Sequence, residues 1–106
     1  MGFFGGPSKG TLLTMSQGIA AVAMQIQMVQ QAESSEREAI LANMRSEGAP
    51  TSMNELVQMA ASVVREQGMG WYKKNQFLGM IFGSLVGMGF SAADANYIKG
   101  QIELLC

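Results

Sequence analysis

The chain has 106 residues, which is enough for a single domain with a modest core. It contains no histidine and a single cysteine, so it has neither an internal disulfide framework nor the usual catalytic base for a nucleophile. Hydrophobic residues make up 48% and charged residues 14%, and the net charge of −1 excludes a global electrostatic attraction for nucleic acid or anionic lipid. This low charge content predicts apolar surface that is buried against protein partners or lipid.

Residues 1–10 form a glycine-rich arm that contains Phe3 and Phe4. We expect these two rings to lock adjacent subunits, because such an arm frays unless something holds it. The apolar segment after Lys9 is interrupted by polar side chains, which argues against a secretory signal. An N-terminal myristoylation signal has serine or threonine at the sixth position, whereas this chain has glycine there, which argues against myristoylation. The rest of the chain, residues 11–106, is predicted to be one helical domain.

The first helix is predicted to begin near Thr11, where apolar residues recur at alternating steps of three and four. This pattern is typical of a heptad seam. The flanking positions are uncharged, so the seam allows two interpretations, a coiled coil with a second chain or packing within the chain's own bundle. The residues of the seam are Leu12, Met15, Ile19, Val22, Ile26 and Val29.

The end of this first element has two alternatives. An unbroken helix over residues 11–46 would be about 54 Å long and would project from a domain of this size. A break at Ser34–Ser35 would instead give a helical hairpin, in which Ser35 and Glu38 form a capping box. Gly48 and Pro50 end the element in either case.

Three more helices are predicted after Pro50. Ser52 with Glu55 indicates one helix start, and Ser91 with Asp94 indicates another. Between them, a helix is expected from Trp71 to about Gly87. No segment alternates with period two, so the fold class is all-α. We expect a small bundle of three to five helices, with a long N-terminal helix or hairpin and a glycine-faced third helix.

The strongest signal is the spacing of Gly79, Gly83 and Gly87, which places three glycines on one face of a helix. Each glycine costs about 1 kcal/mol relative to alanine in a helix interior, so the three cost roughly 3 kcal/mol without a compensating contact. The pattern predicts a close contact with another helix. Three alternatives are open for the partner helix: another subunit of an assembly within a bilayer, a second copy of the protein in water, or another part of the same monomer.

A membrane interpretation rests on the residues around this glycine face. Trp71, Tyr72, Lys73 and Lys74 are typical of a membrane-interface anchor. Residues 77–93 follow without a charge, although their length is at the short end of the roughly 17 to 25 residues that cross a bilayer.

The sequence shows no phosphate-binding loop and no cluster of metal ligands, so we expect no enzyme activity, no cofactor, no metal and no nucleic-acid partner. We predict a self-associating helical subunit of a larger homomeric assembly, such as a virion component or part of a secretion apparatus. One alternative is a membrane-inserting oligomer that uses residues 77–93. Another is a soluble helical adaptor or chaperone that binds a heterologous partner.

Overall fold

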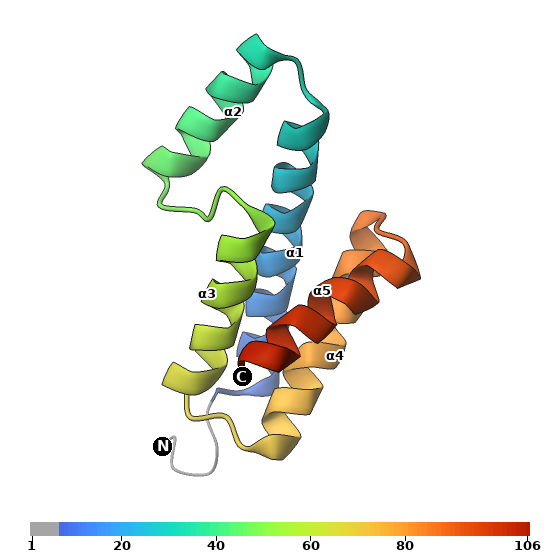
Figure 1. The fold of residues 1–106 in the computed structure, drawn as a ribbon. Coiled ribbons are helices and arrows are strands. Elements are labelled where there is room, and N and C mark those ends of the chain that lie inside the picture. Colours follow the sequence, from blue (N-terminus) through green and yellow to red (C-terminus); the bar gives the residue numbers. More distant parts are fainter. Residues whose placement is uncertain (1–6) are drawn as a thin grey trace.

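The structure is a computed structural model that describes residues 7–106, and every described element is a helix. The prediction of an all-α fold is therefore confirmed for this part of the chain. Phe3 and Phe4 lie outside the described residues. In chain order the helices are α1 (Lys9–Gln31), α2 (Ser34–Ser46), α3 (Met53–Glu66), α4 (Trp71–Met88) and α5 (Ala92–Leu105) (Figure 1).

Helix α1 begins at Lys9 rather than at Thr11, because the Ser8 side chain accepts a hydrogen bond from the Thr11 amide at 3.3 Å. It ends at Gln31, and the next residue, Ala32, has an extended backbone with ψ of 157°. The alternative of one unbroken helix is therefore wrong, and the hairpin alternative is right.

The break differs in detail from the predicted one. Glu33, with ψ of 161°, is the N-cap of α2, and no side chain caps this helix. The proposed capping box of Ser35 and Glu38 does not form the helix start. Instead, Arg37 reaches back across the turn, where its Nε donates to the Val29 carbonyl at 3.1 Å. A second guanidinium nitrogen of Arg37 donates to the Ala32 carbonyl at 2.9 Å. The end of α1 is thus satisfied by a side chain of the following helix.

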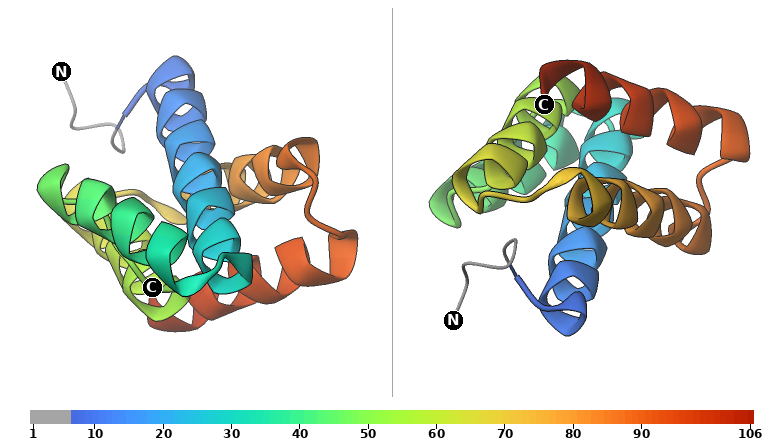
Figure 2. Two further views of the ribbon diagram at one scale, coloured as in Figure 1. Left: turned by 90° about the horizontal axis from the view of Figure 1, so that it is seen from above. Right: turned by 90° about the horizontal axis from the view of Figure 1, so that it is seen from below.

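Helix α2 projects from the rest of the molecule. It packs mainly against α1, and Met44 is its only buried residue, with Ile40 and Leu41 half-buried. Figures 1 and 2 show α2 running back along one side of α1 at one end of the molecule, which measures 47 × 29 × 23 Å. Apart from Met44, the core is therefore built by the other four helices.

Helices α1 and α4 make the most extensive contact in this core, and α5 packs across α4 and α3. Three small residues on one face of α1, Ser16, Ala20 and Ala23, are fully buried. The Ser16 hydroxyl donates to the Leu13 carbonyl at 2.8 Å and lies 3.4 Å from the Ser84 hydroxyl of α4. The close approach of α1 and α4 thus uses small residues of α1.

The predicted heptad seam packs inside the monomer. Leu12, Ile19, Ile26 and Val29 are buried in the chain's own core, while the other two members, Met15 and Val22, are half-buried. Of the two interpretations, the structure therefore supports packing within the bundle.

Two predicted helix starts are confirmed. The Ser52 hydroxyl accepts from the Glu55 amide at 3.1 Å, and the Ser91 hydroxyl accepts from the Asp94 amide at 3.1 Å. The Glu55 carboxylate accepts from the amide of Thr51, at 3.0 Å, rather than from that of the cap residue itself.

The C-terminal end of α4 corrects the bounds of the predicted membrane segment. Residues 77–93 are not one helix, because α4 ends at Met88 and Gly89 adopts a left-handed conformation with φ of 113°. The Phe90 amide then donates to the Leu85 carbonyl at 3.0 Å, and the Phe90 ring is buried.

Candidate functional site

The glycine face of α4, which we define as Gly79, Gly83 and Gly87, points to solvent. All three glycines are exposed, whereas the opposite side of α4 is fully buried in the core. A Cβ atom built on any of the three would have no atom within 4 Å apart from its chain neighbours and the adjacent backbone of α4 itself. No part of the described chain packs onto this face, so the interpretation that it is filled inside the monomer is wrong for the described residues.

Gly83 and Gly87 form the floor of an open groove between α1 and α4. The groove has a volume of about 660 Å³. Its apolar rim includes Leu13 from α1 and Met88 from α4, whose side chains are 44% and 42% exposed. The remaining lining residues are Gln17, Met80 and Ser84.

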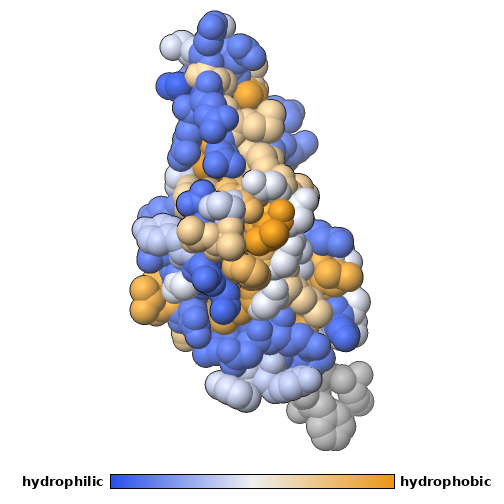
Figure 3. All heavy atoms as spheres, turned by 90° about the vertical axis from the view of Figure 1, so that its right-hand side faces the viewer, coloured by the Kyte–Doolittle hydropathy of each residue, from blue (hydrophilic) through white to orange (hydrophobic). Residues whose placement is uncertain are grey.

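The composition of this groove determines what it can bind. None of its lining residues is ionisable, and its polar groups are one amide, one hydroxyl and backbone. Figure 3 views the molecule from the side on which α4 ends, and apolar residues gather across the middle of that face between more hydrophilic ends. A shallow, uncharged surface with a glycine floor is suited to van der Waals contact with another helix.

The predicted interface anchor lies at the other end of the same helix. Trp71 and Tyr72 are 76% and 71% exposed in the first turn of α4, and Lys73 and Lys74 are half-buried beside them. Helix α4 is about 27 Å long, so the anchor and the groove occupy its two ends.

Only α1, among the described helices, is long and apolar enough to cross a membrane by length and composition, with a mean hydropathy of 1.3. Of this segment, 39% is buried in the core, and the core helix of a soluble protein meets the same criterion. Helix α4 does not meet it. The large apolar residues of α4 that insertion would have to present to lipid, Phe77, Leu78, Ile81 and Leu85, are fully buried.

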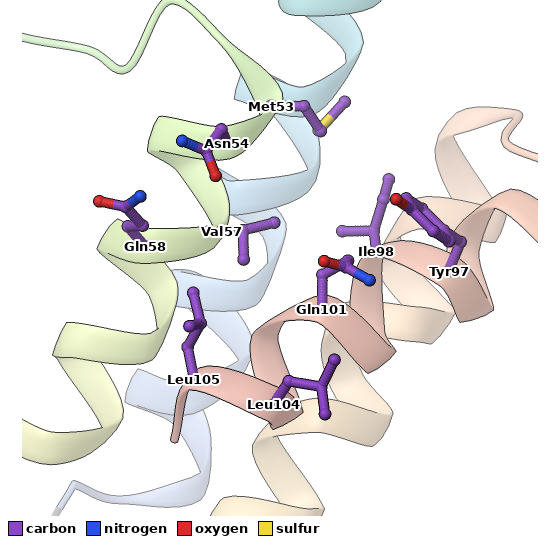
Figure 4. A pocket seen from close by; sticks show the side chains of 9 residues that line it. All are labelled: Met53, Asn54, Val57, Gln58, Tyr97, Ile98, Gln101, Leu104 and Leu105. Carbon is purple, nitrogen blue, oxygen red and sulfur yellow. The ribbon is translucent and has the colours of Figure 1, made fainter.

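A second groove, between α3 and α5, was not predicted from the sequence. It has a volume of about 320 Å³, with Val57 and Ile98 at its base and three side-chain amides around it (Figure 4). Sequence reasoning missed it because its two walls are far apart along the chain. Leu104, an apolar residue outside the buried face of α5 (Ala95, Ile98 and Ile102), was the available signal. The lining residues are Met53, Asn54, Val57, Gln58, Tyr97, Ile98, Gln101, Leu104 and Leu105.

A third, more apolar groove lies between α1, α3 and the loop that precedes α3. It measures about 350 Å³ and includes Met15 and Val22, the two half-buried members of the predicted seam. These two positions are therefore the part of the seam that still reaches the surface. The other lining residues are Gly18, Ile19, Gly48, Ala49, Pro50, Met59 and Val63.

The single thiol lies at the end of α5. Burial raises the pKa of Cys106, while the positive charges of Lys74 and Arg65 act in the opposite direction. A guanidinium nitrogen of Arg65 also donates to the Leu105 carbonyl at 2.7 Å, which holds this end of α5 against α3. Within residues 7–106, no group of three or more potential metal ligands gathers at one place.

Comparison with known proteins finds no matching family model, no curated relative and no solved structure that resembles the chain.

Proposed function

We propose that the protein is a non-enzymatic helical subunit that assembles with copies of itself through the glycine face of α4. The observation that carries the proposal is that Gly79, Gly83 and Gly87 are exposed, with open space where a side chain would stand. The three glycines therefore destabilise the helix by about 3 kcal/mol in total relative to alanine, and no contact from the described chain offsets this cost.

A second helix laid over this face would supply that contact. The backbone of α4 is accessible at each glycine, so two helices can approach more closely than helices lined by leucine. The flanking residues Leu13, Val86 and Met88 are exposed and would be buried by the same contact. No charge lines the groove, so a second copy meets no electrostatic repulsion there. An isologous pair, with α4 against α4, satisfies both copies at once.

The experiment is the particle mass by size-exclusion chromatography with light scattering, in buffer without detergent. We expect a defined multimer, or a species that grows with protein concentration. A clean monomer at all concentrations would contradict the proposed function.

Substitutions at Gly83 test the surface itself. Gly83→Leu fills the groove floor and should reduce the particle mass to that of a smaller species. Gly83→Ala should weaken assembly while stabilising the monomer fold by about 1 kcal/mol, because a methyl group fits the open space and alanine favours the helix. Thermal unfolding of the dilute protein measures the second effect.

Gly100→Ala is the matched control, because Gly100 lies in α5 with equally open space around its missing Cβ. It should stabilise the fold to the same extent and leave the particle mass unchanged. A Gly83→Leu protein with the wild-type mass would show that the assembly uses another surface.

A second candidate function, a helical adaptor, is favoured by the groove between α3 and α5. Its apolar base and surrounding amides suit one face of a partner's amphipathic helix (Figure 4). The light-scattering experiment separates the two functions, since an adaptor remains a monomer or a small dimer until its partner is added.

A further inference from the structure

We propose that the first turn of α4 docks onto the surface of an anionic lipid bilayer while α4 itself stays in the bundle. We call residues Trp71, Tyr72, Lys73 and Lys74 the α4 tip. The proposal differs from membrane insertion, which would remove the buried side of α4 from the core, and it is independent of assembly through the glycine face.

The α4 tip lies at one extremity of the molecule, with Trp71 and Tyr72 exposed and Lys73 and Lys74 half-buried. In Figure 1 the start of α4 and the loop before it form the lower end of the bundle, and the view from below in Figure 2 shows this turn facing the viewer. Trp71 and Tyr72 keep about three quarters of their surface in water, at 76% and 71% exposure. Tryptophan and tyrosine rings favour the headgroup region of a bilayer, where their apolar bodies and polar edges are both satisfied.

Charge is distributed to match an anionic surface. Residues 65–74 carry three cationic side chains and one acidic one, for a net charge of +2. Glu103 of α5 acts on the same Cys106 thiol as Lys74 and Arg65, so it lowers the local side-chain charge to +1. Residues 33–47, in and around α2, carry two cationic and four acidic side chains, for a net charge of −2. These segments lie at opposite ends of the molecule, whose long dimension is 47 Å (Figure 1). An anionic surface therefore attracts the α4 tip and repels the α2 end, which orients the molecule upright.

The arrangement of the two rings favours lipid over single-stranded nucleic acid. Neighbouring residues on a helix point about 100° apart, so Trp71 and Tyr72 do not form a row on which successive bases stack. Both rings at the end of a helix can nevertheless enter the same interface when the helix meets a surface end-on.

The test is flotation of the full chain with vesicles, comparing equimolar phosphatidylcholine and phosphatidylserine with phosphatidylcholine alone. We expect binding to the anionic vesicles that weakens as salt is added. Lys73→Gln with Lys74→Gln should lower the binding constant about 25-fold, because each basic residue near the surface contributes about fivefold.

The matched control is Arg45→Gln with Lys99→Gln, which removes the same charge at sites outside the α4 tip and should leave binding within about twofold of wild type. If the control variant lost vesicle binding to the same extent, the effect would depend on net charge alone, and the proposal would be overturned. Equal binding to both vesicle types would overturn the role of the lysines. Failure to bind vesicles, with lysine-dependent binding to a single-stranded oligonucleotide, would overturn the lipid assignment in favour of nucleic acid.

The Gly83→Leu protein separates this proposal from the proposed function. Its monomers retain the α4 tip, so they should still bind anionic vesicles. Loss of assembly with retained vesicle binding would support the tip as an independent surface, and a Gly83→Leu monomer that no longer binds at all would contradict it.

Discussion

The Cys106 side chain is half-buried at the C-terminal end of α5, next to positively charged groups. Burial disfavours the thiolate and raises the pKa of the thiol, and the nearby Glu103 carboxylate adds to this effect. Lys74 and Arg65 favour the thiolate and offset part of the increase. At neutral pH the thiol is therefore mostly protonated, which slows alkylation and disulfide exchange.

The measurement is the rate of Cys106 alkylation by iodoacetamide as a function of pH. We expect the titration midpoint above that of a cysteine in a short unstructured peptide. Lys74→Gln should move the midpoint further upward, since it removes the largest of the effects that lower the pKa. A midpoint at or below the peptide value would show that the positive charges of Lys74 and Arg65 outweigh the burial of the thiol.

At the scale of single elements, local signals predicted the helix starts at Ser52 and Ser91, because the cap and its amide partner are three residues apart in the chain. The same signal failed at Ser35. There the start of α2 is set by the position of Arg37, whose contacts with Val29 and Ala32 depend on the turn between two helices. A helix cap predicted from sequence is thus reliable only where tertiary contacts do not favour a different start of the helix.

The contrast between Ser91 and Ser35 yields a prediction on stability. Ser91→Ala should lower the free energy of unfolding by about 1 kcal/mol, because the Asp94 amide loses its acceptor. Ser35→Ala should change it by less than about 0.5 kcal/mol, since alanine favours the helix and Ser35 is not the cap. Urea unfolding followed by circular dichroism measures both values, and equal losses would show that Ser35 does cap α2.

For the whole molecule, the sequence predicted the fold class and the residues of the seam but not which surfaces meet. Helical spacing showed that Gly79, Gly83 and Gly87 share a face, and close packing between helices was expected there. The structure instead packs α4 against the small residues of α1 and leaves the glycines outside. Which face turns inward depends on how four helices share one core, a non-local property that spacing along a single helix does not contain.

The packing of α1 against α4 can be tested with adjacent alanines. Ala20 is fully buried on the face of α1 that carries Ser16, while Ala21 is exposed. Ala20→Leu should destabilise the fold by about 1 to 3 kcal/mol, because the extra methyl groups force the helices apart. Ala21→Leu should be nearly neutral. Thermal unfolding compares the two, and equal melting temperatures would contradict the close approach of α1 and α4.

The position of Trp71 has a consequence for spectroscopy. It is the chain's only tryptophan, and it stands at the exposed start of α4 rather than in the core. Its indole is already largely hydrated in the folded state, so its fluorescence emission changes little when the bundle unfolds. The same emission will shift to shorter wavelengths when a surface that excludes water covers the α4 tip. Intrinsic fluorescence in this protein therefore reports on what the end of α4 touches and is nearly silent about folding.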